Sequence, residues 1–201
     1  AASPDGQWLA VCVQRLDRDG AKYASDLWKV PTDGGPAVQL TRGDSKDSSP
    51  CFRYDGALGF LSNRTPNEVK PDDDADKRMQ VWLLPADGGE PRQLTDEPLG
   101  VVAFRFAAKA DRLACFAPVL RGVAFDKQRE AAAERGKKGP SARNFRRQPV
   151  RHWDHWLHQN PDQASTHLIV ATADGQARED LTPEATSEFW IEPQLDLSRD
   201  G

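Results

Sequence analysis

Three of the four histidines in this 201-residue chain stand within seven positions, a density that prompts a search for metal chemistry. They occur at intervals of three residues in the segment Arg151-His152-Trp153-Asp154-His155-Trp156-Leu157-His158. On a helix this spacing would bring imidazoles, which are frequent zinc ligands, close together. The His-Glu-x-x-His pattern of zinc peptidases is absent, however, and the alternation of side chains also fits a strand. We predict an aromatic-rich strand with a solvent-facing edge and no metal site.

A second group of ligating side chains is the acidic run Asp72-Asp73-Asp74-Ala75-Asp76. Carboxylate oxygens are the ligands that calcium prefers, but the spacing of an EF-hand loop and its central glycine are missing. We predict a solvated loop at this position, and no metal or organic cofactor for the chain.

The sequence contains no recognisable catalytic nucleophile. The nearest approach to the Gly-x-Ser-x-Gly turn of serine hydrolases is Gly139-Pro140-Ser141-Ala142-Arg143, which lacks the second glycine and follows no expected strand. Glycine-rich phosphate-binding patterns are absent as well. Cys12, Cys51 and Cys115 fall in short apolar runs without ligand spacing. We therefore predict buried, unreactive thiols and no disulfide framework.

Charge is unevenly distributed along the chain. Charged residues make up 29% and hydrophobic residues 38%, the proportions of a soluble globular protein, and the net charge is −4. Residues 121–151 nevertheless hold ten Lys and Arg against three Asp and Glu. Such a basic segment could bind nucleic acid, but no aromatic stacking pattern accompanies it. We predict a solvated surface excursion and no nucleic-acid partner.

Membrane and targeting signals are missing. No run approaches the roughly 20 apolar residues of a membrane helix, so we predict no membrane association. Residues 1–6 have neither the basic nor the apolar region of a signal peptide. Because the chain begins inside a repeat unit, we expect any leader to lie upstream. The compartment, periplasm or cytoplasm, and the oligomeric state stay open.

Internal repetition is the strongest feature of the sequence. Residues 27–41 (LWKVPTDGGPAVQLT) align without gaps with residues 81–95 (VWLLPADGGEPRQLT), at an offset of 54. A weaker third copy runs from Leu168 to Thr182. Each copy has a short apolar strand, an Asp-Gly turn and a second strand that ends at Leu-Thr. This pattern predicts a β-hairpin.

A second hairpin signal alternates with the first. Asp-Gly or a degenerate form of it recurs at 3–6, 53–56, 108–111 and 198–201, each time beside an apolar run. Each period thus contains two hairpins, or four strands, and recurs about every 50 residues, which is typical of a β-propeller. A β-sandwich also has closely spaced strands, but has no reason to repeat a hairpin almost verbatim.

We therefore predict an all-β fold, part of a β-propeller with four-stranded antiparallel blades. The predicted units are residues 1–48, 49–100 and 101–188, with the start of another at 189–201, which makes three to four blades. Residues 119–166 form an insertion in the third unit, with a short solvated helix at 126–135 that Gly136 terminates. Too few blades are present to close a ring, so we expect a portion of a larger propeller.

The repeats resemble a known family. Ser3-Pro4-Asp5-Gly6 with its following strand, Leu61-Ser62-Asn63-Arg64, and the stretch 80–95 resemble the TolB-type propeller repeat. That repeat occurs in the periplasmic protein TolB and in the N-terminal domain of prolyl oligopeptidase-family serine peptidases. Residues 150–156, after a charged insertion, look like a segment of the dipeptidyl-peptidase V and acylaminoacyl-peptidase branch.

The resemblance implies a two-domain peptidase, in which the propeller restricts entry to a C-terminal α/β-hydrolase domain. That domain and its Ser-Asp-His triad have no counterpart in residues 1–201, so no catalytic residue is expected here. The implied role is to gate and orient peptide substrates from which dipeptides or blocked residues are removed at the N-terminus. The alternative is a TolB-like propeller that binds proteins without peptidase activity.

Five residues are the candidates for contact with substrate, because they are dense in aromatic and charged groups beside an insertion. They are Arg151, His152, Trp153, Asp154 and Trp156. The competing hypothesis for these side chains is packing within the domain.

Overall fold

The computed structural model describes residues 1–17, 19–65, 78–138, 150–152, 155–157, 164–185 and 195–198, with backbone alone for 135–138, 150–152 and 155–157. Almost all of its regular structure is β. The strands are β1 (Trp8–Leu16), β2 (Tyr23–Pro31), β3 (Val38–Gln39), β4 (Asp47–Phe52), β5 (Leu58–Ser62), β6 (Gln80–Leu84), β7 (Arg92–Gln93), β8 (Ala103–Phe106), β9 (Leu113–Leu120), β10 (Val150–His152), β11 (His155–Leu157), β12 (Ala164–Ala171) and β13 (Glu179–Asp180). A 3₁₀ turn at Phe125–Lys127 leads into the helix α1 (Gln128–Lys138).

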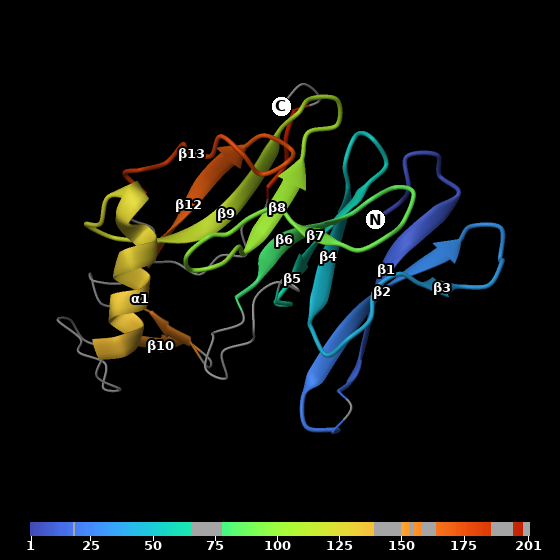
Figure 1. Ribbon diagram of the computed structural model, residues 1–201, viewed down its shortest axis with the longest axis horizontal. Coiled ribbons are helices and arrows are strands. Elements are labelled where there is room, and N and C mark those ends of the chain that lie inside the picture. The colour runs from blue at the N-terminus through green and yellow to red at the C-terminus, as the bar shows by residue number, and fades with distance from the viewer. Residues whose placement is uncertain are drawn as a thin grey trace.

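Within the described residues, these strands form three larger sheets and one hairpin. Sheet A has the order β1-β2-β3, sheet B the order β4-β5-β6-β7, and sheet C the order β8-β9-β12-β13, all antiparallel. The three sheets lie side by side in chain order, from right to left in Figure 1. The coarse prediction, all-β with antiparallel blade-like sheets and one short helix, is confirmed. The number and boundaries of the blades stay predictions.

The Asp-Gly turns lie together at one end of the sheets, and their geometry explains both residues. Gly34 and Gly88 have φ values of +85° and +86°, a backbone conformation that glycine adopts without steric cost. The aspartate side chain accepts a hydrogen bond from the backbone N–H two residues later, as Asp33 does from Gly35 and Asp55 from Ala57. The connections after β1, β5 and β9 leave the opposite end, and those after β5 and β9 are the longest (Figure 1).

The threonine that ends each repeat closes its hairpin. Thr41 Oγ1 accepts from the N–H of Leu27 at 2.9 Å, Thr95 Oγ1 from Val81 at 2.8 Å, and Thr182 Oγ1 from Leu168 at 2.8 Å. The donor and acceptor are 14 residues apart in every case, which is why Leu-Thr recurs at the end of the repeat. The outer strand of each hairpin has only two residues, so its backbone hydrogen bonds soon end. The threonine hydroxyl then accepts the next backbone N–H of the inner strand.

Two hydrophobic clusters hold the sheets together. Between sheets A and B lie Leu27, Phe60 and Trp82, with Ala10, Leu58 and Leu84. Between sheets B and C lie Leu61, Val81, Phe104, Phe106 and Ile169 with their neighbours. Sheet B is therefore covered on both faces, and every residue of β5 and β6 is buried.

Gly59 in β5 allows sheet C to approach sheet B closely. A Cβ atom at this position would lie 2.4 Å from Cε2 of Phe106 and 3.0 Å from Cε2 of Phe104. The two phenylalanine rings themselves meet edge to face, with centroids 5.6 Å apart. Glycine is thus required here because the two phenylalanine rings leave no room for a side chain, and not because of its backbone angles.

The helix differs from its prediction in two ways. Gly136 does not terminate it, because α1 continues to Lys138; two lysines follow the glycine and are good helix formers that suit a helix C-terminus. Nor is α1 simply solvated. The Gln128 side chain is 3% exposed, accepts from the N–H of Leu120 and donates to the carbonyl oxygens of Leu120 and Val123. The start of the helix is therefore docked against the end of β9.

We expect Thr95→Val to lower the free energy of unfolding by about 1–3 kcal/mol, because the isosteric change leaves the buried N–H of Val81 without an acceptor. Thr182→Val should cost clearly less, because Thr182 is half-exposed and water can replace its hydroxyl. Urea unfolding of both variants measures this. Equal losses for the two variants would contradict the dependence on burial, and no loss for Thr95→Val would contradict the closing role of the hydroxyl.

Candidate functional site

The predicted substrate-facing segment forms a hairpin instead of one strand. Val150–His152 (β10) pairs antiparallel with His155–Leu157 (β11), with Arg151 opposite Trp156 and His152 opposite His155. The prediction of a continuous strand was therefore wrong: the register leaves only two residues for the connection, the length of the shortest hairpin loops. Trp153 and Asp154 lie outside the described residues. In the described part of the chain, β10 and β11 pair only with each other and join none of sheets A, B or C.

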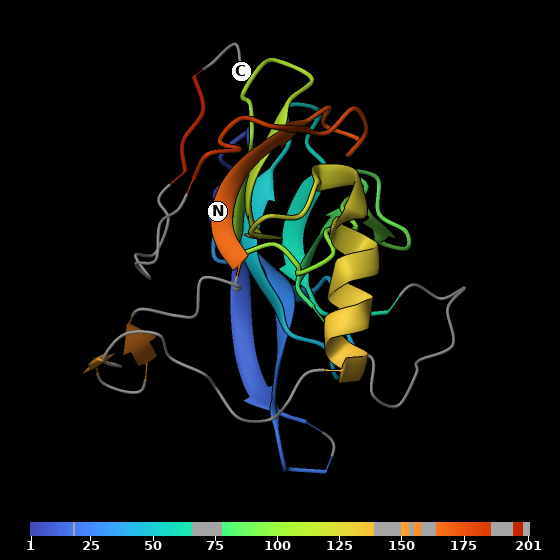
Figure 2. The same cartoon turned by 90° about the vertical axis from the view of Figure 1, so that its left-hand side faces the viewer.

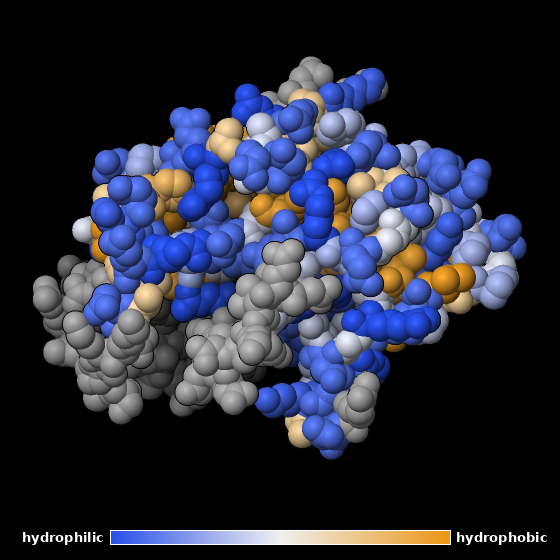
Figure 3. Space-filling view, viewed as in Figure 1, coloured by the Kyte–Doolittle hydropathy of each residue, from blue (hydrophilic) through white to orange (hydrophobic). Residues whose placement is uncertain are grey.

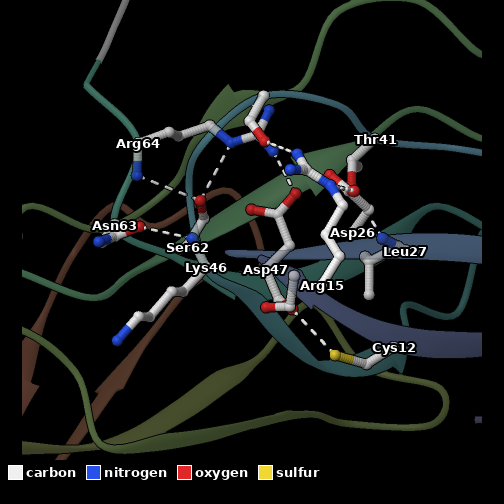
Figure 4. Close-up of polar contacts among 12 residues, drawn as sticks. Cys12, Arg15, Asp26, Leu27, Thr41, Lys46, Asp47, Ser62, Asn63 and Arg64 are labelled. Carbon is white, nitrogen blue, oxygen red and sulfur yellow. Dashed lines mark hydrogen bonds and ion pairs between the residues drawn. The ribbon is translucent and has the colours of Figure 1, made fainter. Parts of the chain in front are cut away.

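A polar cluster missed by sequence analysis lies where sheets A and B meet, at the end with the long connections. We call it the inter-sheet cluster, and Figure 4 shows its members. They are Arg15, Asp26, Asp47, Ser62 and Arg64. Two carboxylates and two guanidinium groups are thereby brought together beside the apolar contact of sheets A and B.

Asp47, the first residue of β4, is the centre of this cluster and is 1% exposed. Its Oδ2 atom pairs with Nη2 of Arg64, and its backbone carbonyl accepts from Ser25 Oγ at 2.7 Å and from Cys12 Sγ at 3.2 Å. Figure 4 shows the carboxylate directed toward Arg64 and the carbonyl toward Cys12. The residue therefore ties both strands of the β1–β2 hairpin to sheet B.

Arg64 is held from three sides. Its Nε atom donates to Ser62 Oγ at 3.0 Å, and its guanidinium lies over the rings of Phe60, at 5.1 Å, and Trp82, at 5.5 Å. Cation–π contacts of this kind strengthen as the cation is desolvated, and the Arg64 side chain is only 17% exposed. Two buried atoms in this region, Asp47 Oδ1 and Trp82 Nε1, have no hydrogen-bond partner.

The second ion pair of the cluster secures the β1–β2 hairpin. Arg15 Nε lies 2.7 Å from Oδ2 of Asp26, whose side chain is 3% exposed, and Arg15 also donates to the carbonyl of Gly43. Asp26 precedes Leu27 in the repeat, and the equivalent positions hold Gln80 and His167. All three side chains are buried. The repeat therefore places a polar group at the same point of each sheet, and each sheet satisfies it differently.

In sheet C this position produces a Ser-His-Asp arrangement. His167 Nδ1 lies 2.7 Å from Asp180 Oδ2, and its Nε2 lies 2.9 Å from Ser165 Oγ. These are the contacts of a hydrolase triad. Ser165 is however 1% exposed and His167 5%, so the hydroxyl is closed to a substrate carbonyl. The contact between His167 and Asp180 joins β12 to β13, and Ser165 completes the hydrogen bonding of the buried imidazole.

At the junction of sheets B and C, a further pair of acids binds the insertion. Glu97, 5% exposed, accepts from Arg178 Nη2 at 2.9 Å, and Arg178 lies 4.5 Å from the ring of Phe125. Arg129 of α1 pairs with Asp96 at 2.7 Å. Burial raises the pKa of Glu97, and Arg178 opposes that shift. These contacts hold the start of the insertion against the body of the domain.

The prediction of buried thiols holds in full for one cysteine of the three. Cys115 is buried, and burial raises the pKa of its thiol to about 12, so it stays neutral. Cys51 is partly buried, whereas Cys12 is exposed, because it lies on the outermost strand of sheet A. None of the three forms a disulfide.

Two expectations concern ligands and membranes. Among the described residues, no group of three or more His, Cys, Asp or Glu side chains is placed to hold a metal ion; Asp72–Asp76 lie outside those residues. No helix in the same part of the chain is both long and apolar enough to cross a membrane. The described polar side chains form buried ion pairs and hydrogen bonds, and these contacts position loops.

Known proteins resemble this chain in sequence and in fold. No family model matches the chain. The uncharacterized peptidase YuxL of Bacillus subtilis is 32% identical over 100 residues, which are 49% of this chain and 14% of that peptidase. The chain thus corresponds to a small part of its curated relative.

Solved structures show the fold. A putative TolB from Agrobacterium tumefaciens superposes with a TM-score of 0.54 at 20% identity, covering 90% of this chain and 47% of that one. The AtxE2 isopeptidase gives 0.55 at 16% identity, covering 92% and 28%. The acylaminoacyl peptidase of Pyrococcus horikoshii gives 0.51 at 12% identity, covering 87% and 22%. The fold is that of a propeller-like domain of the kind found in TolB and in peptidases.

We expect Arg64→Met to lower the free energy of unfolding by about 3–5 kcal/mol, because Asp47 would be left buried without a countercharge. Arg129→Met is the matched control: its pair with Asp96 is exposed at both ends, so its loss should cost at most about 1 kcal/mol. Adding Asp47→Asn to Arg64→Met should recover part of the loss. Chemical unfolding would contradict this account if the two single variants lost equal stability.

Proposed function

We propose that the chain is the non-catalytic propeller portion of a serine peptidase of the prolyl oligopeptidase family. It gates and orients peptides for an α/β-hydrolase domain of the same polypeptide, which removes dipeptides or blocked residues from peptide N-termini. The observation that carries the proposal is the 32% identity with a peptidase over half of the chain, in a match that takes up only 14% of that peptidase. The predicted blade boundaries and the insertion at 119–166 belong to this proposal.

The arrangement of the long connections supports a gating role. The two long connections, after β5 and β9, and the shorter one after β1 all leave the same end of the three sheets, opposite the Asp-Gly turns. The inter-sheet cluster lies at that end, and its buried ion pairs fix the strand ends from which the connections start. Loops on a rigid scaffold are where substrate contacts are usually built.

Within this proposal, Arg151, His152, Trp153, Asp154 and Trp156 are the residues that face substrate. They belong to the connection between β9 and β12, which is the longest of the three. The backbone register pairs Arg151 with Trp156, a cationic with an aromatic residue.

The second candidate function is a TolB-like propeller that binds proteins. It is favoured by the fold match to the putative TolB, of which this chain covers 47%, a larger share than for the peptidases. It predicts further propeller repeats and no hydrolase activity.

The complete polypeptide is expected to react with a fluorophosphonate probe, which labels activated serines, and to hydrolyse p-nitroanilides of dipeptides or of N-acylated amino acids. The isolated 201-residue chain is the internal control and should stay unlabelled, because Ser165 is buried. A complete polypeptide that neither labels nor hydrolyses any of these substrates would exclude the peptidase and leave the binding module.

Arg151→Ala and Trp156→Ala in the complete protein should raise KM for peptide substrates if these side chains line the path to the hydrolase domain. Arg129→Ala, on the exposed face of the same insertion, is the control and should leave KM unchanged. Unchanged kinetics together with lowered unfolding temperatures would assign Arg151 and Trp156 to packing instead.

A further inference from the structure

Asp-Gly pairs carry a reactivity that is separate from their role in turns. The backbone nitrogen after an aspartate can attack the side-chain carboxyl group, and glycine leaves this approach open because it has no Cβ atom. Within the described residues, turns at one end of the sheets hold the pairs Asp5-Gly6, Asp33-Gly34, Asp55-Gly56, Asp87-Gly88 and Asp174-Gly175. Two more, Asp19-Gly20 and Asp200-Gly201, adjoin or belong to residues outside the described part of the chain. Figure 2 shows the β8–β9 turn at the top and the tip of the β1–β2 hairpin at the bottom.

Side-chain hydroxyl groups hold two of these carboxylates. Asp5 accepts from Ser3 Oγ at 2.6 Å, and Asp174 accepts from Thr172 Oγ at 2.5 Å. Each hydrogen bond stabilises the ionised carboxylate and so lowers the pKa of its aspartate. A carboxylate ion is a poor electrophile, because only the neutral acid can release water when nitrogen attacks. These two turns are therefore protected both by charge and by fixed position.

An arginine and a backbone N–H hold two further carboxylates. The Nε atom of Arg53 donates to Asp55 at 2.9 Å, and this contact lowers the pKa of the Asp55 carboxyl group. The Oδ1 atom of Asp33 accepts from the N–H of Gly35 at 3.0 Å. Both carboxyl groups are thereby kept from rotating toward the next backbone nitrogen.

Asp87 differs from these four aspartates. Among the described residues, no hydrogen bond or ion pair holds its carboxylate. Residues 86–90 are all exposed, and no atom lies within 4 Å of the place that a Cβ atom on Gly88 would take. Figure 3 shows a mostly hydrophilic surface on the described part of this face, in keeping with solvated turns. The Asp87 carboxyl group is thus free to rotate toward the nitrogen of Gly88.

The difference from the turn of Asp33 has a local cause, because both turns read Asp-Gly-Gly. Pro36 follows the first, whereas Glu90 stands at the equivalent position of the second. A residue before proline is restricted to extended backbone. Gly89 has no such restriction and takes a φ of +109°, whereas Gly35 is not among the glycines with positive φ. Of the two, only the N–H of Gly35 donates to the aspartate of its turn.

We propose that Asp87-Gly88 is the site at which the folded chain forms isoaspartate. The nitrogen of Gly88 bonds to Cγ of Asp87, and the N–H proton leaves with the carboxyl hydroxyl as one water molecule, which gives a succinimide ring. Water then opens the ring at either carbonyl and yields aspartate or isoaspartate, with no net change in mass. In isoaspartate the main chain runs through Cβ and Cγ, so the turn gains one backbone atom. The inference is independent of the proposed peptidase function.

The attacking nitrogen does not select the site among four of the turns. Gly6, Gly56, Gly88 and Gly175 each donate to the carbonyl oxygen three residues earlier, at 2.8 to 3.1 Å, and the bond of Gly88 is the longest. Gly34 makes no such bond within the described residues. The turn at 33–35 therefore combines a held carboxylate with an unbonded nitrogen, and the turn at 87–89 the reverse. Comparing these two turns separates the two effects.

The test is to incubate the folded 201-residue chain at physiological temperature and to label isoaspartate with protein isoaspartyl methyltransferase. Peptide mapping then locates the label. We expect it to accumulate at Asp87 about fivefold faster than at Asp33, the factor that corresponds to one hydrogen bond of ordinary net strength. In urea the two sites should react equally, because glycine follows aspartate in both. The Asp87→Glu variant should lose the label, since glutamate would need a larger ring.

Exchange of the residue after each turn gives matched variants. Glu90→Pro should slow labelling at Asp87, and Pro36→Glu should speed it at Asp33, because the proline restricts the second glycine. Both positions are exposed, and urea unfolding checks that the fold is retained. Equal labelling of Asp33 and Asp87 in the folded chain overturns the proposal, as does faster labelling of any of the four held aspartates. Absence of label from all five turns overturns it as well.

Discussion

The structure depends on one constraint: an antiparallel sheet with two apolar faces must be covered on both. Sheet B satisfies it, since the clusters around Phe60 and Phe104 bury its two faces. Sheets A and C are stabilised mainly through their contact with it. The closeness of that contact is controlled by single atoms, because any side chain at Gly59 would meet the ring of Phe106. Interiors packed to this density have no room for an added methyl group.

Polar groups buried in these sheets fix the positions of the strands that carry them. Asp26, Gln80 and His167 occupy one position of the repeat, and each is satisfied by a partner that its own sheet supplies: Arg15, Glu97 and Asp180. A buried polar group is costly when unpaired, so each pairing restricts how the sheet can shift. The Ser165-His167-Asp180 contacts belong to this class. Triad geometry without an accessible hydroxyl is a structural feature and not a catalytic one.

The two longest connections, after β5 and β9, leave from sheets whose strands are closely packed, which is the arrangement of a scaffold that carries loops. The likeness to the putative TolB and to the AtxE2 isopeptidase concerns the fold of this scaffold. The start of α1 is docked against this scaffold through the buried side chain of Gln128.

Local order could be predicted from the sequence because it depends on neighbours along the chain. The Asp-Gly turns, the hairpins and the 54-residue repeat follow from positive φ values at glycine and from alternating apolar residues. Contacts between distant residues could not be predicted, because side chains such as Asp47 and Arg64 become partners only when sheets A and B stack. The same holds for the hairpin that divides residues 150–157, for the docking of Gln128, and for the exposure of Cys12 on an outer strand. Sequence alone determined which strands and turns form, whereas tertiary packing decided which polar groups are buried together.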